Sequence, residues 1–116
     1  MITRGTTPYH VFTIPLSSDK LSKVYITYMQ NDEVILDKTI EDITIEPVVQ
    51  DENDEAAATD ITIHLTQEDT LKFHFYPAAE KNIAVIQIRV LTTEGEAYAS
   101  HPIHRRIFGV LKDGAI

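Results

Sequence analysis

The stretch that decides the fold is VYITYMQNDEVILDKTI, residues 24–40. In its first six residues, β-branched, aromatic and other apolar side chains alternate between two faces, as the period of two in a β-strand requires. The dipeptide Asn31-Asp32 is typical of a tight turn, and residues 34–40 then provide a returning strand. This stretch therefore predicts a β-hairpin.

The same alternation recurs on both sides of this hairpin. Pro15 and Pro47 follow two of the alternating segments, where a residue without an N–H marks a strand end or a sheet edge. No helical pattern of about 10–15 residues separates the segments, so a parallel α/β fold is excluded. About seven or eight short strands predict an all-β, antiparallel β-sandwich of the Ig-like kind. The further strands are expected at residues 9–14, 43–46, 61–65, 84–90, 97–100 and 103–110.

One segment departs from the strand period. Thr66 is followed three residues later by Asp69, the pattern of a helix N-terminal cap, with Leu71 close behind. The sequence predicts one short helical turn near residues 67–72 that links two strands.

The length of 116 residues fits a single domain covering residues 1–116, with a short flexible tail at 112–116. Because the chain has no cysteine, disulfides, thiolate metal sites and cysteine nucleophiles are excluded. No apolar run follows Arg4 that would suit an export signal, so synthesis in the cytoplasm is expected.

The net charge of −8 arises in one window of the sequence. Between Lys38 and Lys72 there are ten acidic residues and no Lys or Arg, whereas the rest of the chain carries ten basic and eight acidic residues. Binding to nucleic acid or to an anionic membrane surface is therefore not expected. Residues 50–60 contain no large apolar side chain and are predicted to form an exposed acidic loop.

The acidic loop raises the question of a cation site. Asp51, Asn53 and Glu55 have the spacing of the first ligands of an EF-hand, but Ala56 and Thr62 stand where glycine and glutamate are required. A solvated run of charge is the better interpretation, with a looser cation site as the alternative. His101 and His104 flank Pro102 in an extended segment, so they face opposite sides and predict no metal site.

Catalysis is not expected. The chain has no nucleophile-elbow motif, and its four glycines are too scattered to form a phosphate-binding loop. Glu94 and Glu96 flank Gly95 in a turn, where water would keep both carboxylates ionised. No enzyme activity and no cofactor are predicted.

The aromatic residues divide between core and surface. In a strand, Phe73 and Phe75 would lie on the same face as Leu71, and both rings are therefore expected in the core. Sugar binding through Tyr25, Tyr28 and Tyr98 is an alternative, although tryptophan is absent.

Four patches of the chain together resemble a known group of proteins. They are residues 4–15 (RGTTPYHVFTIP), 24–31 (VYITYMQN), 65–73 (LTQEDTLKF) and 86–97 (IQIRVLTTEGEA). They resemble small uncharacterised proteins encoded by phages and prophages of gut Firmicutes. The strand pattern is also similar to the amino-terminal β-sandwich domain of siphophage baseplate upper proteins. The resemblance implies a tail, baseplate or decoration component without catalytic residues.

Two features depart from that group. A ten-residue acidic insertion separates the strands near Ile43 and Ile61, and the carboxy-terminal region carries His104, Arg105 and Arg106 instead of acidic residues. Either change could alter a contact surface.

The leading hypothesis is a non-enzymatic structural or assembly module of a phage particle, made in the host cytoplasm and carried into the virion. Its expected partners are other phage structural proteins or further copies of the chain, because sandwiches present faces and edges to neighbours. The alternatives are a glycan-binding host-recognition module and a small acidic host-directed phage protein. The expected interface residues are Arg105, Arg106, Ile107, Phe108, Asp51, Glu52, Asp54 and Glu55.

Overall fold

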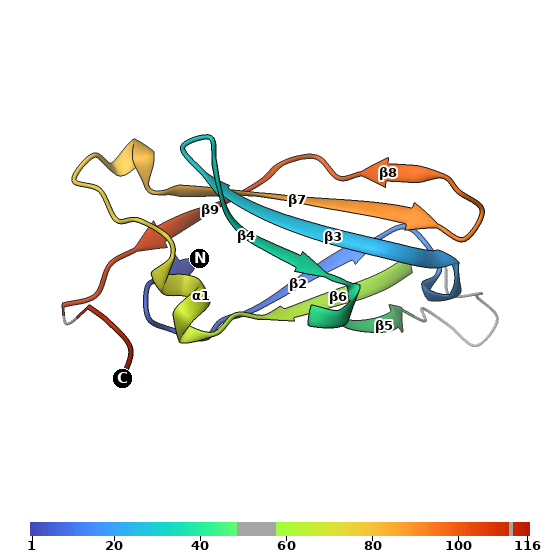
Figure 1. Ribbon diagram of the computed structural model, residues 1–116, viewed down its shortest axis with the longest axis horizontal. Helices are drawn as coiled ribbons and strands as arrows, with labels where there is room; N and C mark the ends of the chain where they lie inside the picture. The colour runs from blue at the N-terminus through green and yellow to red at the C-terminus, as the bar shows by residue number, and fades with distance from the viewer. Residues whose placement is uncertain (49–57, 112) are drawn as a thin grey trace.

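The computed structural model describes residues 1–48, 58–111 and 113–116. In this part of the chain, nine strands form two facing sheets, which confirms the all-β sandwich (Figure 1). The finer Ig-like assignment stays a prediction. The expected acidic loop lies outside the described residues up to position 57. The sequence predicts that this loop extends to residue 60, and this end is wrong, because residues 58–60 are part of a β-strand that pairs with residues 46–48.

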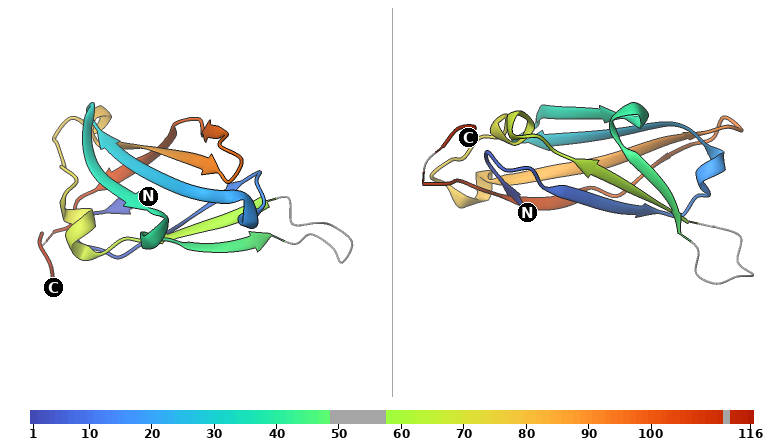
Figure 2. Two further views of the ribbon diagram at one scale, coloured as in Figure 1. Left: turned by 45° about the vertical axis from the view of Figure 1, so that its right-hand side comes forward. Right: turned by 90° about the horizontal axis from the view of Figure 1, so that it is seen from below.

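The two sheets differ in size and face each other across one core (Figure 2). The larger has the strand order β1-β9-β7-β3-β4, with β8 paired to β7, and the smaller has the order β2-β6-β5. All pairs are antiparallel except β1 with β9, which join the first and last strands in parallel. The larger sheet comprises β1 (Ile2–Thr3), β3 (Leu21–Gln30), β4 (Glu33–Thr39), β7 (Ile83–Thr92), β8 (Ala97–Ala99) and β9 (Ile103–Phe108). The smaller comprises β2 (Tyr9–Ile14), β5 (Thr44–Val48) and β6 (Ala58–His64).

The predicted hairpin is present as β3 and β4. Asn31 and Asp32 both adopt positive φ angles, of 50° and 64°, which a two-residue turn of this kind requires and which Asn and Asp tolerate. The pairing register shifts between Tyr28 and Met29, so a bulge interrupts the ladder just before the turn.

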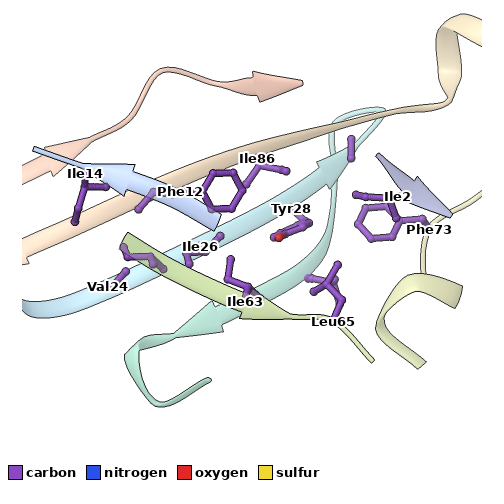
Figure 3. Close-up of a cluster of buried hydrophobic side chains, with 14 of the residues drawn as sticks. Ile2, Phe12, Ile14, Val24, Ile26, Tyr28, Ile63, Leu65, Phe73 and Ile86 are labelled. Atoms are coloured by element: carbon purple, nitrogen blue, oxygen red, sulfur yellow. The ribbon is translucent and has the colours of Figure 1, made fainter. Parts of the chain in front are cut away.

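The core lies between the sheets and follows the predicted alternation (Figure 3). In β2, in β7 and in β3 from Val24 onward, every second side chain is buried, because each strand has one face toward the opposite sheet. The largest fully buried side chains are those of Tyr28 and Phe73, whose ring centroids are 6.0 Å apart.

The predicted helical turn is α1 (Gln67–Leu71). The Thr66 hydroxyl accepts a hydrogen bond from the Asp69 N–H (3.1 Å), and the Asp69 carboxylate accepts one from the Thr66 N–H (3.0 Å). Lys38 donates to the same carboxylate at 3.0 Å. The reciprocal cap therefore also ties the turn to β4. Three short 3₁₀ turns complete the elements, η1 (Ser18–Lys20), η2 (Ile40–Asp42) and η3 (Ala79–Lys81).

The expectation that Phe75 lies in the core with Phe73 is wrong. Phe73 is fully buried, but 54% of Phe75 is exposed. The segment after Phe73 forms no strand, so a period of two cannot carry the buried face forward. Instead, the Gln30 side chain hydrogen-bonds the main chain of His74.

Candidate functional site

A groove opens along one side of the sandwich, between β2 of the smaller sheet and β7, β8 and β9 of the larger sheet. Its volume is about 740 Å³, within the range of ligand-binding clefts. The walls are mostly apolar, and the apolar residues that line it are Val11, Phe12, Ile14, Leu16, Ile88, Val90, Tyr98 and Ile103, with Pro15 and Ala99.

The groove lies between two sheet edges. In the described part of the chain β2 pairs only with β6, so its other edge has no partner strand. β8 and β9 both pair with β7, and β1 covers the outer edge of β9 only at Ile107 and Phe108. The sandwich is therefore open where β2 faces β8 and β9.

Ser100 interrupts the edge formed by β8 and β9. Its N–H donates to the Ile88 carbonyl at 2.8 Å, and its hydroxyl accepts from the Ile88 N–H at 3.0 Å. The Gln87 side chain donates to the Ser100 carbonyl at 3.1 Å. These bonds hold the break in the strand in one conformation, next to the rim residue His101.

Arg105 supplies the positive charge of the groove. It lies opposite the buried Ala84 in the β7–β9 register, and its side chain lines the groove. Its guanidinium donates to the His104 carbonyl at 2.9 Å. No carboxylate lies within ion-pair distance of it among the residues the structure describes.

The neighbouring predicted interface residues lie on other surfaces. The Arg106 guanidinium stands 5.5 Å from the centroid of the Phe108 ring, on the outward face of the larger sheet. Ile107 is only 2% exposed and packs in the core, so its expected place in an interface is wrong. Strand alternation explains this division, since Arg105 and Ile107 share one face and Arg106 and Phe108 share the other. The expected acidic interface residues Asp51, Glu52, Asp54 and Glu55 lie outside the described residues.

His10 and Tyr28 form a polar pair between the sheets. The His10 Nδ1 and the Tyr28 hydroxyl are hydrogen-bonded at 2.7 Å, and the two rings stack with centroids 5.8 Å apart. His10 is 9% exposed, and its Nε2 has no partner in hydrogen-bonding geometry within the described chain. Burial lowers the pKa of His10, an effect partly opposed by the Met1 carbonyl. Burial likewise raises the pKa of the Tyr28 hydroxyl. Both groups are therefore neutral near pH 7.

This pair predicts a pH-dependent stability. The ordinary pKa of histidine is 6.5, and in the folded chain that of His10 is lower. As the pH falls through about 6.5, the unfolded chain takes up a proton that the folded chain does not, so the free energy of unfolding decreases. Urea denaturation at pH values of about 7.5 and 5.5 should show this decrease in the native protein and a smaller one in His10→Gln. The exposed His101→Gln is the matched control and should retain the full decrease; equal pH dependence in all three proteins would contradict the prediction.

The alternative metal and sugar sites are not assembled in the described residues, and the alternative cation site at Asp51, Asn53 and Glu55 lies outside them. No group of three or more His, Asp or Glu side chains is placed to hold a metal ion there. The tyrosines are spread over several surfaces. Tyr28 is buried, Tyr25 is exposed on the larger sheet, Tyr9 stacks on His64, and only Tyr98 lines the groove.

Sequence reasoning missed the groove and the role of His10. The signal for His10 was present, because His10 has the same spacing as Phe12 and Ile14 and therefore lies with them on the inward face of the strand. The groove had no local signal, since it depends on which distant strands pair and which edges remain open.

Comparisons with known proteins found no match. Neither a family model, nor a curated protein, nor a solved structure is significantly similar to this chain. Among the described residues, no helix is long and apolar enough to cross a membrane.

Proposed function

We propose that this protein is a non-enzymatic structural or assembly module of a phage or prophage particle, acting through protein–protein contacts. The resemblance set out above suggests the particle, and the distribution of charge over the two sheets supports the mode of action. Its partners are other structural proteins of the particle or further copies of the chain.

The two sheets carry charges of opposite sign. The larger sheet contains five basic residues and two acidic ones. The basic residues are Lys23, Lys38, Arg89, Arg105 and Arg106, and the acidic residues are Glu33 and Asp37, both in β4. The smaller sheet, β2, β5 and β6, contains Glu46 and Asp60 and neither Lys nor Arg. An arrangement of this kind favours contact between the outward face of one sheet and that of the opposite sheet in a neighbour.

Both outward faces also carry exposed apolar side chains. Tyr9 and Val11 are exposed on the smaller sheet, and Tyr25 and Phe108 on the larger sheet. Apolar contact supplies most of the free energy of association, while charge selects the partner and the orientation. The faces thus combine both elements of a protein interface.

Charge reversal on the larger sheet tests the mode of action. Arg106→Glu should weaken self-association, with a Kd on the order of tenfold higher at low salt, because it places like charges between neighbouring faces. Sedimentation velocity over a concentration series measures this change. Lys20→Glu makes the same change of charge in η1, outside both sheets, and is the matched control. Unchanged sedimentation of Arg106→Glu would contradict self-association through these faces.

Particle composition tests the assignment to a phage. If the proposal holds, mass spectrometry of purified particles from an induced host strain carrying the gene should detect peptides of this chain in fixed proportion to other structural proteins. Detection only in the soluble lysate would argue against a virion component and in favour of the host-directed alternative.

A further inference from the structure

We propose that the groove between β2 and β8–β9 is an acceptor site for one extended strand of a partner protein. The strand would be apolar on the side facing the groove and would carry an acidic residue beside Arg105. This inference rests on the proposed function, because it identifies the kind of partner contact that an assembly module would make.

The free edge of β2 has the main-chain groups that such a strand needs. The Leu65 N–H donates to the Pro8 carbonyl at 3.0 Å, in register with the pairs between β2 and β6. The hydrogen-bonded pairs of this ladder therefore fall on the even-numbered residues of β2. Tyr9, Val11 and Thr13 consequently direct their N–H and C=O groups toward the edge that has no partner strand within the described residues.

The groove-lining residues agree with this assignment. Val11 and Thr13 line the groove although they lie on the opposite face of β2 from the buried Phe12 and Ile14. In an incoming strand, alternate side chains would contact Phe12 and Ile14 from β2 and Ile88 from β7. Strand addition of this kind takes affinity from main-chain hydrogen bonds and specificity from side-chain pockets.

The opposite edge is less suited to extending a ladder. Ser100 and Pro102 interrupt it between β8 and β9, and Pro102 has no N–H to donate. On β9, the His104 carbonyl already accepts a hydrogen bond from the Arg105 guanidinium and is therefore less available to an incoming strand. We therefore assign the hydrogen bonds of the incoming strand to β2 and its side-chain contacts to both sheets.

Charge defines one end of the strand. Arg105 pairs with Ala84, two residues along β7 from Ile86, which pairs with Tyr28. Because Tyr28 is hydrogen-bonded to His10, this register places Arg105 toward the amino-terminal end of β2. Because Arg105 has no carboxylate partner in the described part of the chain, an acidic residue of the incoming strand would supply one. A basic residue at that position would be repelled in a largely apolar groove.

A random peptide library tests the proposal without a prior choice of sequence. A displayed library of random peptides of about eight residues, which span the six residues of β2, is selected on the folded protein. The expected consensus alternates large apolar residues and contains an acid at one end. The Arg105→Glu variant should bind that consensus peptide on the order of tenfold more weakly. Peptides selected on this variant should carry a basic residue where those selected on the native protein carry an acidic one. Arg106→Glu, on the outward face, is the matched control and should select the native consensus.

A second variant tests the hydrogen bonding. Val11→Pro removes one N–H from the free edge without removing a bond to β6, and should abolish selection while the circular dichroism spectrum stays native. With the selected peptide bound, amide hydrogen exchange should slow at Val11 and Thr13 in the native protein.

Several results would overturn the proposal. The first is that the native protein selects no more peptide than the Val11→Pro variant does. The second is that the Arg105→Glu variant selects the same consensus as the native protein. The third is that amide exchange at the β2 edge slows as protein concentration rises without any peptide, which would make a second copy the occupant. Binding of small apolar compounds without any selected peptide would make the groove a ligand pocket. None of these results bears on Arg106→Glu sedimentation or on particle composition, so the proposed function succeeds or fails separately.

Discussion

Replacing Phe73 with alanine is expected to lower the free energy of unfolding by about 3–5 kcal/mol. The Phe73 side chain is fully buried against Tyr28, and Ile2 and Leu65 lie in the same core cluster. Its removal eliminates the transfer free energy of the ring and leaves a cavity, because the surrounding strands hold their positions. Urea denaturation followed by circular dichroism near neutral pH measures the change.

Phe75 provides the matched control, since it is the same residue two positions further along the chain. Its ring is largely exposed and rests against Gly109. Phe75→Ala should therefore cost less than about 1 kcal/mol. If the two substitutions destabilised the protein equally, the placement of Phe73 in the core and Phe75 at the surface would be wrong.

Replacing Gln30 with leucine should cost about 3 kcal/mol, although it exchanges a polar for an apolar side chain in a buried position. The Gln30 amide donates to the carbonyls of His74 (2.7 Å) and Lys81 (3.0 Å), and its carbonyl accepts from the His74 N–H (2.8 Å). Leucine would leave the His74 N–H and carbonyl without this partner, and would leave the Lys81 carbonyl with only the longer bond from the Asn31 amide at 3.4 Å. The desolvation cost of such groups outweighs the gain from burying a larger apolar side chain.

Gln87→Leu is the control for this second substitution. Gln87 is half-buried and makes one hydrogen bond, to the Ser100 carbonyl at 3.1 Å. Its replacement should cost less than about 1 kcal/mol. A comparable loss in both variants, measured by the same denaturation experiment, would show that the Gln30 bonds to residues 74 and 81 are not what stabilises this end of the sandwich.

The strands could be predicted because their signal is local. Alternation and turn residues identified residues 9–14 and the hairpin around Asn31-Asp32, and the cap formed by Thr66 and Asp69 identified the helical turn α1. The period failed where a side chain replaced a ladder, at Gln30 and the segment after Phe73. There a strand-like sequence is held by three side-chain hydrogen bonds instead of by a neighbouring strand. Strand ends also differed, since β6 begins at Ala58 and the strand expected at residues 103–110 ends at Phe108.

The candidate site could be predicted only in part. Arg105 was identified from the charge pattern, and alternation alone separates it from Arg106. The open edge of β2 could not be predicted, because it depends on β6 pairing with one side of β2 and on no described strand pairing with the other. Such pairings link residues far apart in the sequence, as in Phe12 with Ile61, and leave no local pattern.

The parallel contact between β1 and β9 has a consequence for synthesis. Ile2 pairs with Ile107, so this edge of the larger sheet cannot form until the residues from Ile2 to Ile107 have been synthesised. At translation rates of about 5–20 residues per second, this separation corresponds to roughly 5–20 seconds. During that time Ile2, which is fully buried in the finished protein, lacks its partner strand, and pairing between such distant strands is itself slow. Until β9 emerges, the strand edges of β1 and β7 that it pairs with are unprotected, which favours aggregation of the nascent chain.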